Sequence, residues 1–231
     1  MNAQNGHLDI GGVFDSTTEI YKNCFGTVWI VALVLLIPAN IIVALLGNGI
    51  LGIIGSLISL AASAWLMGSI IKIVQDVEAD GRVDMSVGEI LGAVWPRIVP
   101  IVLLEIVVGI LVAIGLIFLI IPGVILALMW SVSLPALVVE DKGVFDSMSR
   151  SSDLTRENRM RILGLAILIL ILYLVLIIVV ALLAAITPIL GIIVGIVLGV
   201  LIYPYIAIIS TVLYFNLVEL KEGLVMASET V

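Results

Sequence analysis

Residues 162–187 decide the fold class of this chain. Their sequence is ILGLAILILILYLVLIIVVALLAAIT, and it contains no charged side chain. A helix needs about 20 apolar residues to cross the hydrocarbon layer of a bilayer, so this stretch is long enough to span one. It lacks the polar face of a soluble helix and the strict alternation of an outer-membrane β-strand. The stretch therefore predicts a transmembrane helix.

Five further apolar stretches accompany it, over residues 27–47, 51–72, 98–120, 124–139 and 189–216. The composition agrees, since 63% of the 231 residues are hydrophobic and 12% are charged, and the mean hydropathy is +1.37. Soluble domains are about half apolar and a quarter charged. The sequence therefore predicts an all-α polytopic membrane protein with six transmembrane helices in one domain, residues 1–231.

The cations follow a strict pattern along the chain. Lys22 precedes the first stretch and Lys221 follows the sixth. The other eight flank the second and third stretches (Lys72, Arg82, Arg97) or separate the fourth and fifth (Lys142, Arg150, Arg156, Arg159, Arg161). The turns near residues 47–49, 122–123 and 187–188 carry no charge. Because cationic loops stay in the cytoplasm, we expect a multi-pass protein of the inner or plasma membrane with both termini cytoplasmic.

The chain contains an internal repeat. The sequence GVFDS occurs at residues 12–16 and again at 143–147, each time ahead of a pair of apolar stretches. Ser86 and Glu89 form a capping box ahead of the middle pair. These features predict three units, at about 9–74, 84–140 and 141–220. Each unit is an amphipathic interfacial helix followed by an out-and-back hairpin, and because each starts on the same side, the repeats are parallel rather than inverted.

Apolar side chains at helical spacing define the three surface helices. The stripes are Val13, Thr17, Ile20, Tyr21, Cys24 and Phe25; Val87, Ile90, Leu91, Val94, Trp95 and Ile98; and, more weakly, Val144, Phe145, Met148 and Ser152. These faces should turn toward lipid or the bundle, whereas Glu19 and Glu89 should face water.

Among the polar residues within the apolar stretches, Glu105, Asn40 and Asn216 are the main candidates for a functional or structural role. An intramembrane carboxylate is a functional-site hypothesis by default. No other stretch supplies a partner carboxylate, Lys or His deep in the layer. We therefore interpret Glu105 as a protonated carboxyl hydrogen-bonded to a neighbouring helix, with Asn40 and Asn216 as further polar links between helices.

Glycines recur every fourth residue at Gly191, Gly195 and Gly199. This spacing makes a flat groove that lets another helix approach closely. The partner is a helix of the same chain, over 27–47 or 162–187, or a second copy of the protein.

The connection before residue 162 is rich in Arg, with Arg150, Arg156, Arg159 and Arg161. It anchors the following helix at the membrane surface, or contacts lipid phosphate or a partner. The net charge of −7 argues against nucleic acid as a partner. With one Cys (Cys24) and one His (His7), the chain offers no internal disulfide and no metal site, and it carries no phosphate-binding or nucleophile motif, so no cofactor is expected.

One region is similar to a known group. It comprises IPGVIL at 121–126, Trp130, Pro135, VVEDKGV at 138–144, SSDLTREN at 151–158 and ILG at 162–164. The chain resembles a superfamily of six-helix prokaryotic membrane proteins. That group includes the membrane domain fused to some glycerophosphoryl diester phosphodiesterases and stand-alone families of unknown function. The resemblance implies the six-helix fold but no phosphodiesterase activity, because the soluble domain is not in this sequence; Ser152 and Asp153 also stand where the group often has a Trp.

These observations favour a non-enzymatic integral membrane protein that acts as an accessory, scaffold or lipid-associated subunit. The alternative is a small transporter or channel that uses Glu105, and a weaker alternative is a membrane-embedded lipid enzyme. Membrane lipids are the expected partners, and a homo-oligomer or a larger membrane complex is left open.

Overall fold

The computed structural model describes residues 8–47 and 49–229, and these residues fold into helices without a strand. The α-helices are α1 (Ile10–Leu46), α2 (Ile50–Asp80), α3 (Val87–Val94), α4 (Ile98–Phe118), α5 (Ile120–Met129), α6 (Ser133–Val139), α7 (Val144–Thr155), α8 (Arg159–Ile186) and α9 (Pro188–Glu229). The short 3₁₀-helix η2 (Trp95–Arg97) joins α3 to α4. Six segments of the described chain are long and apolar enough to cross a membrane, so the prediction of an all-α fold with six candidate spans is confirmed.

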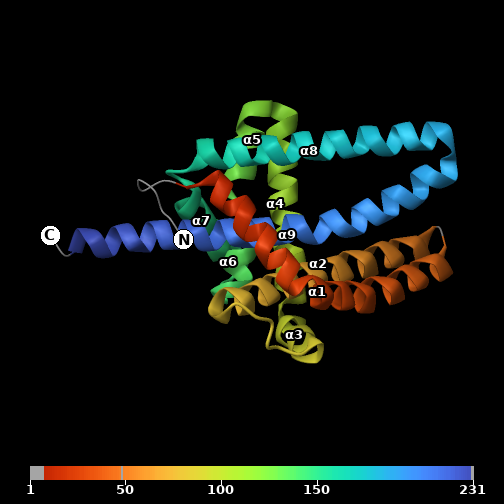
Figure 1. The fold of residues 1–231 in the computed structure, drawn as a ribbon, viewed down its shortest axis with the longest axis horizontal. Coiled ribbons are helices and arrows are strands. Elements are labelled where there is room, and N and C mark those ends of the chain that lie inside the picture. The colour runs from red at the N-terminus through yellow and green to blue at the C-terminus, as the bar shows by residue number, and fades with distance from the viewer. Residues whose placement is uncertain (1–7, 48, 230–231) are drawn as a thin grey trace.

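The helices pair into three hairpins, α1–α2, α4–α5 and α8–α9 (Figure 1). The first and third extend toward the same side of the molecule, whereas α4–α5 lies across them. The crossing of α2 with α3 and α4 is close at Gly68, where an added Cβ would lie 2.5 Å from Val94 Cγ1 of α3 and 2.8 Å from Ile101 Cδ1 of α4. The internal repeat predicts three equivalent hairpins, whereas the second hairpin runs in a different direction from the other two.

The three surface helices differ in form. The capping box of Ser86 and Glu89 begins α3 as predicted. The first amphipathic segment is not separate, because α1 runs without interruption from Ile10 to Leu46. Its stripe residues Val13 and Ile20 are buried in the bundle, and Glu19 is exposed.

The third surface helix, α7, buries only part of the predicted stripe. Met148 is buried and Val144 packs against the second apolar cluster, whereas Phe145 is 74% exposed. Ser147, Ser151 and Thr155, which were not predicted, are fully buried. These positions are four residues apart and share one helix face, so the face that packs on the bundle is largely hydroxylic.

The apolar core lies where the hairpins meet rather than along their whole length. Val28, Ile70 and Val212 belong to one cluster from α1, α2 and α9. Ile71, Ile101 and Leu137 belong to a second cluster from α2, α4 and α6. The arms beyond these clusters expose large apolar side chains, most evidently α8, as expected of helices whose surroundings are lipid.

Candidate functional site

The fourth candidate span is broken in the middle. The sequence predicts one stretch over 124–139, but the structure has α5 up to Met129, a turn at 130–132, and α6 from Ser133. A turn inside an apolar span frees backbone N–H and C=O groups, which cost several kcal/mol each in hydrocarbon if they find no partner. The break therefore requires polar groups from other helices.

Helix α7 supplies the first of these groups. The Ser151 hydroxyl donates to the Met129 carbonyl at 2.7 Å and accepts from the Val132 N–H at 3.3 Å. Thr155 donates mainly to the carbonyl of Ser151, at 2.9 Å. One buried hydroxyl thus closes both sides of the break.

Helix α9 supplies the second group, and Pro135 explains why it is needed. Proline has no N–H, so Pro135 cannot donate to the carbonyl of Ser131, four residues earlier. The Ser210 hydroxyl donates to that carbonyl at 3.0 Å instead. The break is therefore fastened on one side to α7 and on the other to α9.

A group of charged side chains lies beyond α6, and we call it the charged cluster. It comprises Arg97, Glu140, Asp141, Lys142, Arg150 and Glu222. Glu140 is its centre, because it accepts from Arg150 Nε at 2.7 Å and from the Tyr214 hydroxyl at 2.7 Å, and its second oxygen pairs with Lys142 at 2.9 Å. Arg150 also donates to Glu222 at 3.1 Å, and Arg97 pairs with Asp141. The charged cluster thereby joins α6, α7 and α9 and connects them to the start of α4.

The surroundings of Glu140 favour its charged form. Partial burial raises the pKa of this carboxyl, but the hydrogen bonds from Tyr214, Arg150 and Lys142 outweigh that effect. The pKa of Glu140 therefore lies below its ordinary value of 4.5. Glu140 is a charge-paired structural carboxylate rather than a proton donor near neutral pH.

The N-terminal end of the described chain is fastened to the connection between α7 and α8. The Leu8 N–H donates to Asn158 Oδ1 at 3.2 Å, and Arg161 donates to the Leu8 carbonyl at 2.6 Å. The Leu8 side chain is buried. Helix α1 thus starts from a fixed point on the third unit.

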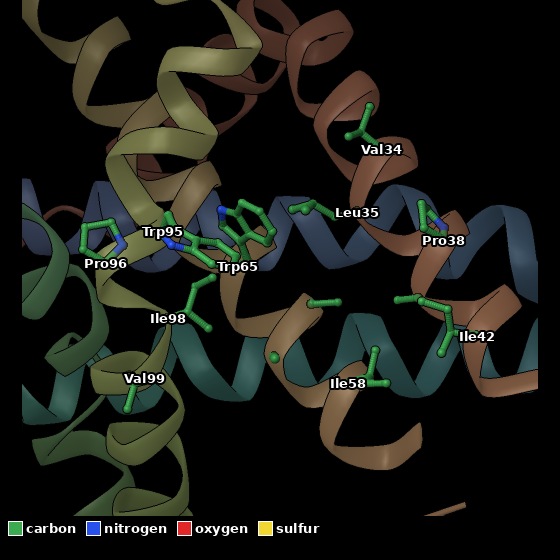
Figure 2. Close-up of a pocket in the computed structure, with 13 residues that line it drawn as sticks. Val34, Leu35, Pro38, Ile42, Ile58, Trp65, Trp95, Pro96, Ile98 and Val99 are labelled. Carbon is green, nitrogen blue, oxygen red and sulfur yellow. The ribbon is translucent and has the colours of Figure 1, made fainter. Parts of the chain in front are cut away.

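An apolar groove opens between α1, α2 and the η2–α4 segment (Figure 2). Its volume is about 600 Å³. The lining residues are Val34, Leu35, Pro38, Ala39, Ile42, Ile58, Ala61, Ala62, Trp65, Trp95, Pro96, Ile98 and Val99. The groove has no ionisable side chain in its walls, so its chemistry suits an apolar ligand.

The structure does not bring the predicted polar residues together. Asn40 donates to the Leu36 carbonyl and Asn216 to the Val212 carbonyl, each within its own helix rather than across to another. Glu105 is half-buried, and no hydrogen bond joins it to a group that the structure describes.

The glycines of α9 are described only in part. An added Cβ at Gly191 would lie 2.3 Å from the Cβ of Ala184 on α8, so this glycine sits at the close approach within the third hairpin. Packing at Gly195 and Gly199 lies outside the residues whose surroundings the structure describes.

The four arginines of the predicted phosphate contact have separate roles. Arg150 is engaged by Glu140 and Glu222, and Arg161 by the Leu8 carbonyl. Arg156 is exposed, and the Nε of Arg159 is buried without a hydrogen-bond partner in the described chain. Among residues 8–47 and 49–229, no group of three His, Cys, Asp or Glu side chains could hold a metal ion.

The sequence analysis did not identify the hydroxyls of Ser151, Ser210 and Tyr214 or the carboxylate of Glu140, which join the helices. Two signals were available. Ser147, Ser151 and Thr155 recur every fourth residue, and Pro135 inside an apolar stretch frees a carbonyl. Neither signal names its partner on another helix, so the contacts with Ser210 and Tyr214 needed the structure.

Comparison with known proteins places this architecture in a family. The model of an "Uncharacterised protein family (UPF0259)" matches residues 50–216, which contain the helix break and most of the charged cluster. The UPF0259 membrane protein SG1383 of Sodalis glossinidius (strain morsitans) is 31% identical over 114 residues, which are 49% of this chain and 44% of that protein. The alignment thus covers less than half of that relative. No solved structure matches the chain.

Proposed function

Because the chain belongs to the uncharacterised UPF0259 family of prokaryotic membrane proteins, whose name carries no activity, we propose its function from its geometry. We propose a non-enzymatic integral membrane protein that acts as an accessory, scaffold or lipid-associated subunit.

The observation that carries this proposal is that the polar side chains inside the bundle bond to other parts of the same chain. Ser151 and Ser210 bond to the backbone of the α5–α6 break, and Tyr214 bonds to Glu140. A nucleophilic enzyme needs a hydroxyl or thiol within reach of a base and of its substrate. Here the buried hydroxyls hold helices to one another, which supports a structural role.

The proposal includes an orientation. The cations gather at one end of the spans and in the connections on that side, which supports both termini in the cytoplasm and a place in the inner or plasma membrane. Membrane lipids are the proposed partners, with self-association or a larger membrane complex as the wider setting. The resemblance to the membrane domains of glycerophosphoryl diester phosphodiesterases is kept as part of this proposal, without their activity.

The alternatives are a transporter or channel that uses Glu105 and, less well supported, a lipid enzyme. Glu105 is not among the residues that line the groove. Proton and cation pathways are built from chains of polar groups, and Glu105 has no described hydrogen-bond partner to continue one. The accessory role is therefore favoured over transport.

Reconstitution tests the proposal against both alternatives. The purified chain is placed in phospholipid vesicles with an entrapped pH dye, and the wild type is compared with Glu105→Gln and with empty vesicles. The expected result is the same proton leak in all three and an unchanged phospholipid composition by mass spectrometry. A leak that depends on Glu105 would contradict the proposal in favour of transport, and a new lipid product would contradict it in favour of an enzyme.

A further inference from the structure

We infer that Glu105 forms, with Ser63 and Tyr203, a binding site for a lipophilic amine within the apolar part of the bundle. Each hairpin contributes one of the three side chains, since Ser63 is on α2, Glu105 on α4 and Tyr203 on α9. The Tyr203 hydroxyl lies near the side chains of both Ser63 and Glu105. The inference goes beyond the proposed function, because it adds a ligand class and a site that an accessory subunit does not require.

The packing of α2 on α4 places Ser63 and Glu105 at the same contact. Ala64 of α2 is buried in the same apolar cluster as Ile101 and Leu104 of α4. Ser63 directly precedes Ala64 in the chain. Glu105 directly follows Leu104 and lies one helical turn from Ile101. Both polar side chains are therefore at the edge of the contact between the two helices.

Tyr203 continues the polar face with which α9 packs into the bundle. Tyr203, Ser210 and Tyr214 lie on one face of this helix, because they are seven and four residues apart. Ser210 bonds to the backbone of the α5–α6 break, and Tyr214 bonds to Glu140 of the charged cluster. Tyr203 is the member of this face that lies deepest in the apolar stretch. Its hydroxyl is directed toward Ser63 and Glu105 instead of a backbone group.

A cavity between α8 and α9 gives access to Tyr203 from the lipid. Its volume is about 300 Å³, and its walls are aliphatic side chains together with Tyr173 and Tyr203. Tyr173 and Ile177, on the α8 side, are 51% and 47% exposed, so the cavity opens on the outside of the bundle. Both helices belong to candidate spans, so the medium outside is hydrocarbon. A molecule dissolved in the lipid therefore reaches the Tyr203 ring without passing through water.

The chemistry of the three groups selects a base as the ligand. In hydrocarbon a carboxyl without a cation keeps its proton, and no group of the described chain accepts a hydrogen bond from Glu105. A neutral amine is soluble in the lipid and takes that proton, which moves from the carboxyl oxygen to the amine nitrogen. The products are a carboxylate and an ammonium group, which form an ion pair. The hydroxyls of Tyr203 and Ser63 supply donors for the buried carboxylate. An alcohol is not basic enough to take the proton.

Protection from a hydrophobic carbodiimide tests the inference. Dicyclohexylcarbodiimide adds to a protonated carboxyl: the acid proton goes to a carbodiimide nitrogen, and the carboxyl oxygen bonds to the central carbon. The purified chain in phosphatidylcholine nanodiscs is treated with this reagent alone, with N,N-dimethyldodecylamine or with dodecanol. The tertiary amine is used because it cannot form an amide with the activated carboxyl. Mass spectrometry follows the labelling of the peptide that contains Glu105, and Glu105→Gln shows that the label is on this residue.

The expected result is labelling of Glu105 that the amine slows several-fold and the alcohol leaves unchanged. Tyr203→Phe should lose most of the protection by the amine, whereas Tyr173→Phe, the matched change on the other side of the cavity, should keep it. The rate of labelling without amine shows in each variant that the carboxyl is still reachable. Absence of labelling, equal protection by the alcohol and the amine, or protection that does not depend on Tyr203 would each overturn the inference. None of these outcomes bears on the vesicle leak or the lipid composition, so the proposed function fails or stands separately.

Discussion

At the scale of single residues, three hydroxyls and one carboxylate hold the protein together where its helices leave the apolar arms. Ser151 and Ser210 satisfy the backbone of the α5–α6 break, and Tyr214 bonds to Glu140. Each of these bonds joins two helices. Because an unsatisfied buried group costs more than an ordinary hydrogen bond contributes, stability should depend strongly on such residues.

Ser151→Ala tests the closure of the break. The change removes the partner of the Val132 N–H and the main partner of the Met129 carbonyl, so the free energy of unfolding should fall by about 1–3 kcal/mol. The matched control is Ser152→Ala on the same helix, whose hydroxyl bonds to no residue of the described chain and whose loss should have little effect. Unfolding by SDS in mixed micelles measures both, and equal stability of the two variants would contradict the assignment.

The lowered pKa of Glu140 predicts how the stability of the protein depends on pH. Its pKa is lowered on folding, so the unfolded state binds more protons in acid than the folded state. Its contribution is complete above the ordinary value of 4.5 and is lost as the pH falls through the lower, folded pKa. Glu140→Gln should weaken the decline of stability below pH 4.5 in an SDS titration series. Glu157→Gln, on the connection between α7 and α8, is the control and should decline as the wild type does. A decline unchanged in Glu140→Gln would show that other carboxyls cause it.

The residue scale is also where sequence-based prediction was weakest. Glu105, Asn40 and Asn216 stand out because they are polar among apolar neighbours, yet the two asparagines bond only within their own helices. The residues that join helices are ordinary Ser, Thr, Tyr and Glu near the ends of the apolar stretches. A hydrogen bond between residues 131 and 210 depends on tertiary packing, and one sequence carries no record of it.

At the scale of elements, the apolar stretches are reproduced closely, because hydrocarbon thickness fixes their length. Hydropathy did not predict the break at 130–132 or the continuity of α1. The break depends on hydroxyls from other helices. Helix α1 is continuous because no helix-ending residue separates its interfacial segment from its apolar stretch, and the helix also continues through Pro38. Hydropathy reports how apolar a segment is but not where neighbouring helices satisfy its backbone.

Gly68→Ala tests the close crossing of α2 with α3 and α4. The new methyl group would lie 2.5 Å from Val94 Cγ1, and a valine side chain has little rotamer freedom with which to retreat. Overpacking of this kind should lower the free energy of unfolding by about 1–3 kcal/mol. Gly109→Ala in α4 is the control, because its Cβ meets nothing within 4 Å, and it should leave stability unchanged or raise it by about 0.5–1 kcal/mol. If both variants unfold alike in SDS, the close crossing is absent in the membrane.

At the scale of the whole molecule, we expect six membrane crossings with all cations on one side. The chain is a membrane protein with six candidate spans, and the placement of its charges favours both termini in the cytoplasm. The second hairpin is the informative part, because it lies across the other two in Figure 1. Six crossings require its turn near Leu119 to reach the same side as the other two turns.

Cysteine labelling in intact cells measures this directly. In a Cys24→Ala background, single cysteines replace Asn48, Leu119, Thr187 and Asp80, one at a time. An impermeant thiol reagent added outside should label Asn48→Cys, Leu119→Cys and Thr187→Cys, whereas Asp80→Cys should be labelled only after the cells are permeabilised. Labelling of Asp80→Cys from outside, or protection of Leu119→Cys until permeabilisation, would contradict six crossings with a cytoplasmic charged side.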